Sequence, residues 1–303
     1  MNNDFKNPYL NGADPFVLTY GGKYYLYCTR QTNENLEAFK TSTDGVDGFE
    51  VYESEDLKNW ENKGFCLKKG EGVIGEKWFW APEVTFYKGK FYISYSAEEH
   101  MAIAVADSPL GPFTQPEQKW LREGKSIDGH IFIDDNGEAY LFYVRLQGGN
   151  RIFVAKLSED LLSITEEYED CLIEAETPWE TIDCKVAEGP FVLKHNGLYY
   201  LSYSCNHTRC KDYAVGYATS DSPTGPFKKY KENPILHGND KICGLGHHAF
   251  APTVDGTGFI CSYHCHSDNP DNFKPRRVCF NTAEFKKADN GEDILTVNGP
   301  TTE

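Results

Sequence analysis

The chain has 303 residues, of which 40% are hydrophobic and 14% aromatic, and its formal net charge is −16. An acidic surface repels phosphate backbones and anionic lipid headgroups, so the composition argues against nucleic-acid and membrane partners. The sequence contains no apolar run of about eighteen residues that could span a membrane, and its first residues contain no apolar signal-peptide core. We therefore predict a cytoplasmic protein.

One pattern recurs five times along the chain, at a spacing of roughly sixty residues. Each copy has a short apolar run, a turn and a run rich in aromatic residues, and the turns are Gly21-Gly22, Lys88-Gly89, Asn136-Gly137, Asn196-Gly197 and Asp255-Gly256. Asn-Gly and Gly-Gly readily adopt the positive φ angles of tight hairpin turns, so each copy is predicted to be a β-hairpin. The apolar runs 16–18, 131–133 and 191–193 have no polar face, which is typical of strands buried on both sides.

A second pattern lies between the hairpins, in segments 49–60, 102–113, 152–162 and 214–227. Each of these segments has a strand followed by a turn, so a repeating unit contains a hairpin, a third strand and a turn that leads to a fourth. Four antiparallel strands repeated radially make a blade of a β-propeller. We predict an all-β protein, a single five-bladed β-propeller over residues 1–303 with four antiparallel strands per blade. A β-sandwich is the alternative, but it does not explain why both patterns recur in order.

Segments 61–80 and 163–187 are polar and irregular, and we expect them to be long loops between blades. The ten cysteines are expected to be reduced thiols that pack in the core, as in most cytoplasmic proteins. Segments 205–210 and 263–266 contain both Cys and His and could be interpreted as zinc ligands. Neither has the paired spacing of a structural zinc site, so zinc is not predicted.

Polar residues stand at or near the start of each hairpin: Asp14, Glu83, Asp128, Glu188 and His247. The first strand of each propeller blade lines the central channel, so these five side chains are expected to converge. Neighbouring carboxylates raise one another's pKa, and one of them can be protonated near neutral pH while another stays ionised. Two such carboxyl groups on either side of a sugar ring are what glycoside hydrolysis requires.

The chain resembles glycoside hydrolase family 43 in five short motifs that occur in the same order: Ala13-Asp14-Pro15, Trp80-Ala81-Pro82, Ile127-Asp128, Glu188-Gly189-Pro190 and Gly246-His247-His248. Members of that family are five-bladed propeller enzymes that act on arabinose- and xylose-containing glycans. The resemblance implies that Asp14 is the general base and Glu188 the general acid, and that Asp128 tunes the pKa of the acid and orients it. The family inverts the anomeric carbon, which requires a gap of about 6.5–9.5 Å between base and acid.

The resemblance implies further roles around these carboxylates. Trp80 would form an apolar wall for the sugar, and Arg276 would reach towards substrate and carboxylates while Arg277 points away. His247 would help to hold calcium or another hydrated cation in the channel, and no organic cofactor is expected. His247 could equally be a hydrogen-bonding residue, and Glu83 could contact substrate or be structural.

The predicted function is an inverting exo-glycosidase that releases a terminal pentose from arabinoxylan- or arabinan-derived oligosaccharides. We favour α-L-arabinofuranose because the sequence ends soon after the fifth hairpin, so we expect no C-terminal β-sandwich of the kind that many xylosidases of the family carry. A β-xylosidase, or a bifunctional xylosidase/arabinofuranosidase, is the first alternative. A non-catalytic carbohydrate-binding propeller is the alternative from another class of protein.

Overall fold

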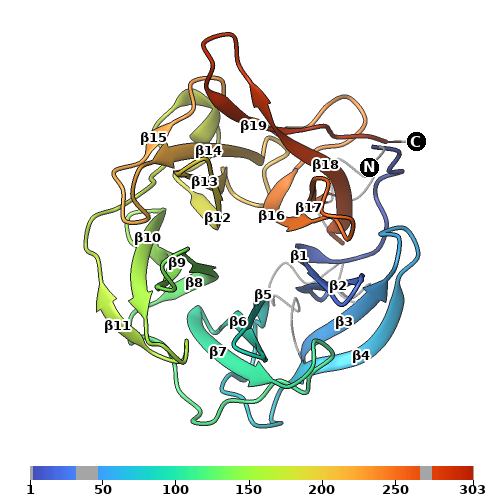
Figure 1. Cartoon of the computed structure of the whole chain (residues 1–303), viewed down its shortest axis with the longest axis vertical. Helices are drawn as coiled ribbons and strands as arrows, with labels where there is room; N and C mark the ends of the chain where they lie inside the picture. The colour runs from blue at the N-terminus through green and yellow to red at the C-terminus, as the bar shows by residue number, and fades with distance from the viewer. Residues whose placement is uncertain (1–2, 32–46, 267–274, 303) are drawn as a thin grey trace.

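The strands of the molecule form five sheets around a central axis, as Figure 1 shows for the computed structural model, which describes residues 3–31, 47–266 and 275–302. Consecutive strands are neighbours in every sheet, and the first strand of each sheet lies innermost. Within the described ranges, no helix is long and apolar enough to cross a membrane. The prediction of an all-β, five-bladed propeller is confirmed.

The strands are numbered in chain order. Blade 1 consists of β1 (Ala13–Tyr20), β2 (Lys23–Thr29), β3 (Gly48–Ser54) and β4 (Glu61–Lys68); blade 2 of β5 (Trp80–Tyr87), β6 (Lys90–Ala97) and β7 (His100–Ala106); blade 3 of β8 (Ser126–Ile133), β9 (Ala139–Leu146), β10 (Asn150–Leu157) and β11 (Ile164–Glu167); blade 4 of β12 (Ala187–His195), β13 (Leu198–Cys205), β14 (Ala214–Ser220) and β15 (Lys228–Lys229); and blade 5 of β16 (Gly246–Pro252), β17 (Phe259–Cys265), β18 (Arg277–Lys287) and β19 (Asp293–Val297).

The outermost strand is the most variable part of the blades. In blade 2 it is reduced to a single bridge in which Val105 and Thr114 exchange backbone hydrogen bonds of 2.8 and 3.0 Å. Pro112 and Pro116 flank Thr114, and a proline has no N–H to extend the ladder. The expectation that 61–80 and 163–187 are wholly loops is wrong, because β4 and β11 lie within them. Both are outer strands exposed to solvent, so their sequences are polar.

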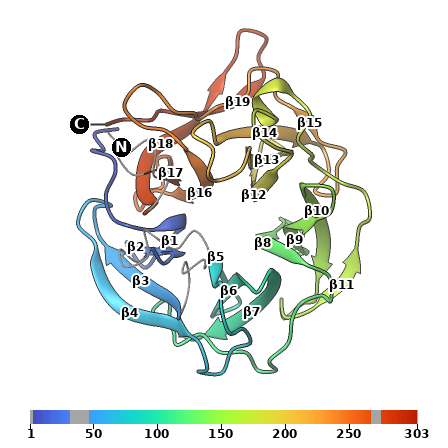
Figure 2. The same ribbon diagram turned by 180° about the vertical axis from the view of Figure 1, so that it is seen from behind.

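The first residues of the chain close the ring. Tyr9 N–H donates to the Val278 carbonyl, and Val278 N–H donates to the Leu10 carbonyl, both at 2.8 Å. This segment pairs with the first half of β18 and leads directly into blade 1. The two ends of the chain therefore lie side by side between blades 1 and 5 (Figures 1 and 2), and the hydrogen bonds tie the last blade to the first.

The second strand of every blade contributes at least one fully buried tyrosine to the core, and these are Tyr27, Tyr95, Tyr143, Tyr203 and Tyr263. A buried tyrosine needs a partner for its hydroxyl group. Tyr27 donates to the Pro109 carbonyl at 2.6 Å and Tyr263 to Asn281 Oδ1 at 2.7 Å. The aromatic runs seen in the sequence thus fill the space between blades, and their hydroxyls connect them to outer segments.

Candidate active site

The inner strand of every blade carries a β-bulge at the same level of the channel. The residue at each bulge has a positive φ angle: Asp14 (52°), Ala81 (48°), Asp128 (58°), Gly189 (56°) and His247 (47°). Four of the five are not glycine, and the left-handed conformation costs roughly 1–2 kcal/mol for such residues. Residues held in this way cluster at functional sites. The bulges bring Asp14, Asp128 and His247 to one end of the channel.

Hydrogen bonds between neighbouring blades hold these bulges. A bulge interrupts its own ladder, and in four blades the N–H of the bulge residue donates to a side chain of the preceding blade: Asp14 to His264 Nδ1 (3.2 Å), Ala81 to Thr29 Oγ1 (2.9 Å), Asp128 to Ser96 Oγ (3.0 Å) and His247 to Ser204 Oγ (2.9 Å). The four acceptors occupy equivalent positions, each paired with the residue before the bulge of its own blade. Val144 stands at this position in blade 3. There Gly189 N–H donates instead to Asp128 Oδ2, at 3.2 Å.

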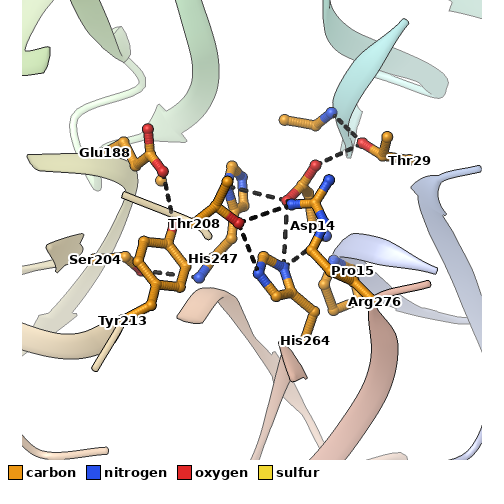
Figure 3. A network of polar contacts seen from close by, with 12 residues as sticks. Asp14, Pro15, Thr29, Glu188, Ser204, Thr208, Tyr213, His247, His264 and Arg276 are labelled. Atoms are coloured by element: carbon orange, nitrogen blue, oxygen red, sulfur yellow. Dashed lines mark hydrogen bonds and ion pairs between the residues drawn. The ribbon is translucent and has the colours of Figure 1, made fainter. Parts of the chain in front are cut away.

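Asp14 is buried among positive and neutral donors (Figure 3). Arg276 Nη1 lies 3.0 Å from its Oδ1, and the Thr29 hydroxyl donates to its Oδ2 at 2.7 Å. His264 Nδ1 and His247 Nδ1 lie 3.3 and 3.4 Å from Oδ1. Burial opposes ionisation, but the charges of Arg276 and His247 and the contact with His264 hold the pKa of Asp14 well below its ordinary value. Asp14 is therefore a carboxylate that can accept a proton.

Glu188 has a different set of neighbours. The Tyr213 hydroxyl donates to its Oε1 at 2.9 Å, and Asn150 Nδ2 donates to its Oε2 at 2.8 Å. The side chain is buried, and its neighbour Gly189 donates its N–H to Asp128. Neutral donors thus orient Glu188, whereas cationic groups surround Asp14. Two carboxyl groups in such different environments can divide the roles of acid and base between them.

The pKa of Asp128 is set by effects that act in opposite directions. Burial raises its pKa to about 7, and the charges of Glu188 and Asp14 act in the same direction. The charge of His247 and the Gly189 N–H act in the opposite direction. Asp128 therefore gains or loses its proton close to neutral pH, while Asp14 stays ionised.

One loop that the sequence did not single out for catalysis reaches both sides of the site. It joins β13 to β14, and its Thr208 Oγ1 accepts from Arg276 Nη1 at 3.1 Å. Tyr213, at its other end, bonds to Glu188 and stacks on His264, with ring centroids 5.6 Å apart. In the sequence, segment 205–210 was considered only for its possible zinc ligands. Among the residues that the structure describes, no three His, Cys, Asp or Glu side chains are grouped to hold a metal ion.

Glu83 lies one level deeper in the channel than the three other carboxylates. The residues two positions after each bulge form a floor, made of Phe16, Glu83, His130, Phe191 and Ala249. Glu83 Oε2 is 2.7 Å from His130 Nδ1. The rings of His130 and Phe191 pack together with their centroids 4.3 Å apart. Of the two roles considered for Glu83, this position favours the structural one.

Glu83→Gln is expected to lower the free energy of unfolding by about 1–3 kcal/mol, because it weakens a buried hydrogen bond to His130. The rate of hydrolysis should change by less than about twofold, because the floor residue does not reach the level of Asp14 and Glu188. Thermal unfolding and steady-state kinetics measure the two effects. The exposed Glu117→Gln is the matched control. A large rise in KM with unchanged stability would show that Glu83 contacts substrate.

Trp80 and Arg276 also lie at the level of the bulges. Trp80 stands immediately before the bulge of blade 2, as Glu188 does in blade 4, and its ring stacks on Trp78 at a centroid distance of 5.7 Å. Arg276 is buried against Asp14, and the Arg277 side chain lies by the Pro8 carbonyl, 3.4 Å from it. The half-buried indole of Trp80 is available as a wall for a sugar ring.

For His247 the sequence left two roles open, a ligand of a hydrated cation and a hydrogen-bonding residue. Its Nδ1 faces Asp14 Oδ1 at 3.4 Å. Burial lowers the pKa of His247, but the charges of Asp14, Asp128 and Glu188 outweigh this effect and raise it above its ordinary value. This shift favours the positively charged imidazole between the carboxylates. A cation held by His247 stays a prediction, and no step of the reaction below is routed through one.

Comparisons with known proteins agree with this arrangement. The family described as Glycosyl hydrolases family 43 matches residues 5–289. The β-D-galactofuranosidase xynD of Aspergillus niger is 28% identical, over 96% of this chain and 84% of that protein. The xylosidase/arabinosidase 43A of Humicola insolens is 30% identical, over 71% of this chain and 77% of that protein.

Among solved structures, an endo-1,4-β-xylanase from Bacteroides thetaiotaomicron has a TM-score of 0.85 and is 42% identical, over 96% of both chains. A thermostable family-43 glycoside hydrolase has a TM-score of 0.82 and is 36% identical, over 100% of this chain and 97% of that chain. The region that the family matches includes the inner strands of all five blades and the three carboxylates. The chain therefore belongs to glycosyl hydrolase family 43, and it is a glycoside hydrolase.

Proposed function

We propose that this glycoside hydrolase is an inverting exo-enzyme that releases a terminal pentose, α-L-arabinofuranose before β-D-xylose, from arabinoxylan- or arabinan-derived oligosaccharides. The observation that carries the proposal is the contrast between Asp14 and Glu188, one surrounded by cations and the other by neutral donors. Relatives named as a xylosidase/arabinosidase and as arabinofuranosidases support a pentose, and the relative named as a galactofuranosidase supports a furanose ring.

In the proposed reaction, water attacks the anomeric carbon on the face opposite the leaving oxygen as the glycosidic bond breaks, so the configuration inverts. Asp14 takes a proton from the water, and Glu188 gives its proton to the departing oxygen. Asp128 accepts the N–H of Gly189, directly next to Glu188 in the chain, and in this way orients the acid. The positive charge of His247 and Arg276 keeps Asp14 ionised until it receives the proton.

The floor of the channel supports release of a terminal sugar. Phe16, His130 and Phe191 fill the channel below the carboxylates and are all buried. A sugar that enters from the open end is stopped by this floor at the level of the carboxylates. Arg276 and Trp80 offer hydrogen-bond donors and an apolar surface at the same level.

A substrate panel tests the proposal. Nitrophenyl α-L-arabinofuranoside, β-D-xyloside and β-D-galactofuranoside, with linear and branched pentose oligosaccharides, are incubated with the protein, and the anomer formed first is followed by NMR. We expect a free pentose with inverted configuration. Retained configuration would overturn the mechanism, and no turnover on any substrate would favour a carbohydrate-binding propeller.

Cleavage of xylosidic bonds is the second candidate. Relatives named as xylosidases and the neighbour titled an endo-1,4-β-xylanase favour it. Products distinguish the candidates: xylose alone indicates a β-xylosidase, and oligosaccharides formed from the interior of xylan indicate an endo-enzyme.

A further inference from the structure

A pocket of about 350 Å³ opens on the end of blade 4 that carries Glu188. Its lining combines apolar surface from Trp179, Ile182 and Pro234 with polar groups of Lys211, Asp212 and Asn239. Ile182 is 56% exposed, more than any other large apolar side chain in the described part of the chain. Apolar surface beside several hydrogen-bonding groups is the composition expected of a sugar-binding pocket, because a pyranose or furanose ring has apolar faces and a rim of hydroxyls.

The loops that line the pocket are held in place by buried groups. Asn206 is fully buried; its Oδ1 accepts from Ile182 N–H at 2.8 Å, and its Nδ2 donates to the carbonyls of Trp179 and Asp212 at 2.8 and 3.1 Å. Glu180, next to Trp179, is also fully buried and pairs with Lys229 at 2.7 Å. The pocket is therefore formed before any ligand binds, which reduces the entropic cost of binding.

The pocket lies next to a residue that contacts the acid. Asp212 lines it, and the next residue, Tyr213, donates its hydroxyl to Glu188 at 2.9 Å. A general acid protonates the oxygen of the leaving group, so the leaving group lies on the side of Glu188. We propose that this pocket binds a sugar residue of the leaving-group portion of a neutral oligosaccharide, an inference that rests on the proposed function.

Kinetics on substrates of different length test this inference. The wild-type protein and Ile182→Asn are compared on a nitrophenyl pentoside and on pentose oligosaccharides of two to six units. Removing the exposed apolar surface should lower kcat/KM for the longer oligosaccharides about five- to tenfold and leave the nitrophenyl pentoside unaffected. Val254→Asn is the matched control, because Val254 is an exposed apolar residue in the turn between β16 and β17.

The ratio of kcat/KM on the longer oligosaccharides to kcat/KM on the nitrophenyl pentoside is compared between the two proteins. If this ratio is the same in Ile182→Asn and in the wild type, the inference is overturned. Calorimetric titration of the intact chain with a xylohexaose or arabinohexaose measures binding without relying on cleavage. It therefore tests the pocket separately from the proposed function. If the wild type cleaves no pentoside but Ile182→Asn binds the hexaose more weakly, the pocket is supported and the proposed function fails. Equal binding by both proteins would overturn the pocket.

Val144 supports a second, independent inference. It occupies the position at which the other blades place His264, Thr29, Ser96 and Ser204 as acceptors for the N–H of the next bulge. A valine cannot accept a hydrogen bond, and Gly189 N–H goes to Asp128 Oδ2 instead. We infer that Val144 is a positioning residue that reserves the Gly189 N–H for Asp128 and so fixes the third carboxylate beside the acid.

Val144→Thr tests this role, since it places a hydroxyl where blades 1, 2 and 4 carry one. The hydroxyl should compete for the Gly189 N–H, and Asp128 then loses a donor that stabilises its ionised form. The pKa of Asp128, already about 7, should rise further, so kcat/KM should fall about three- to tenfold and most strongly below pH 7. Val144→Ser carries the same hydroxyl and serves if the threonine variant does not fold.

Val144→Ala is the control, because it removes methyl groups without adding an acceptor. We expect it to be less stable but to keep the wild-type pH profile. If Val144→Thr and Val144→Ser keep the wild-type pH profile, the inference is overturned. It is also overturned if the pH profile of Val144→Ala shifts as much as that of the hydroxyl variants.

Discussion

Asp14→Asn is expected to lower kcat/KM about 10³-fold on every substrate, whatever its leaving group. An amide cannot take the proton of the attacking water, and this proton must be removed whether the leaving group is good or poor. The carboxamide is nearly the same size as the carboxylate and still accepts from Thr29, so the site should keep its shape. Rates on a dinitrophenyl and on an unactivated pentoside measure the effect.

The exposed Asp107→Asn, which also removes one negative charge, is the control and should leave both rates unchanged. A pH profile of the wild type adds a second check. The pKa of Asp14 lies well below 3.8, the pKa of an ordinary aspartate. Protonation of Asp14 should therefore reduce kcat/KM only at pH values below 3.8. Full activity of Asp14→Asn on both substrates would show that another group accepts the proton.

The repeat in the sequence predicted the blades because both its turns and its strands are local features. Asn196-Gly197 and the apolar run before it encode a hairpin without help from the rest of the chain. The fourth strands could not be predicted in the same way. They are exposed edge strands, and in blade 2 prolines on either side of Thr114 leave only a bridge.

Three of the five polar residues that the sequence placed around the channel share one position in their blades. Asp14, Asp128 and His247 occupy equivalent bulges, whereas the equivalents in blades 2 and 4 are Ala81 and Gly189. A signal for this alignment was present, because Pro15, Pro82 and Pro190 each follow the bulge residue. Alignment on these prolines places Glu83 level with Phe16 and Phe191, in the floor, and Glu188 one residue before the bulge.

The uncharged residues that hold the site could not be predicted from the sequence, although Arg276 was. Thr29 and Ser204 contact the site only because the blades stand side by side, and a one-residue change in register would turn each to the opposite face of its sheet. Asn150 and Tyr213 begin or precede third strands, and they reach Glu188 from different blades. Such contacts depend on the closure of the ring, which no local pattern encodes.

Glu188→Gln is expected to give a loss of activity that depends on the leaving group. An unactivated sugar oxygen leaves as an alkoxide unless it is protonated, so kcat/KM for pentose oligosaccharides should fall about 10³-fold. A dinitrophenolate is stable without a proton, so the corresponding aryl pentoside should lose less than about tenfold. The glutamine can still accept from Tyr213 or Asn150, which keeps the site intact.

The contrast between the two variants assigns the roles more firmly than either alone. Asp14→Asn should be equally slow on both kinds of substrate, and Glu188→Gln should be slow only where the leaving oxygen needs a proton. Tyr213→Phe serves as the intermediate case, since it removes one donor to Glu188 but keeps the carboxyl group, and its smaller loss should also be greater on oligosaccharides. Equal losses on both substrates in Glu188→Gln would assign Glu188 to binding rather than to protonation, because a binding defect does not depend on the stability of the departing anion.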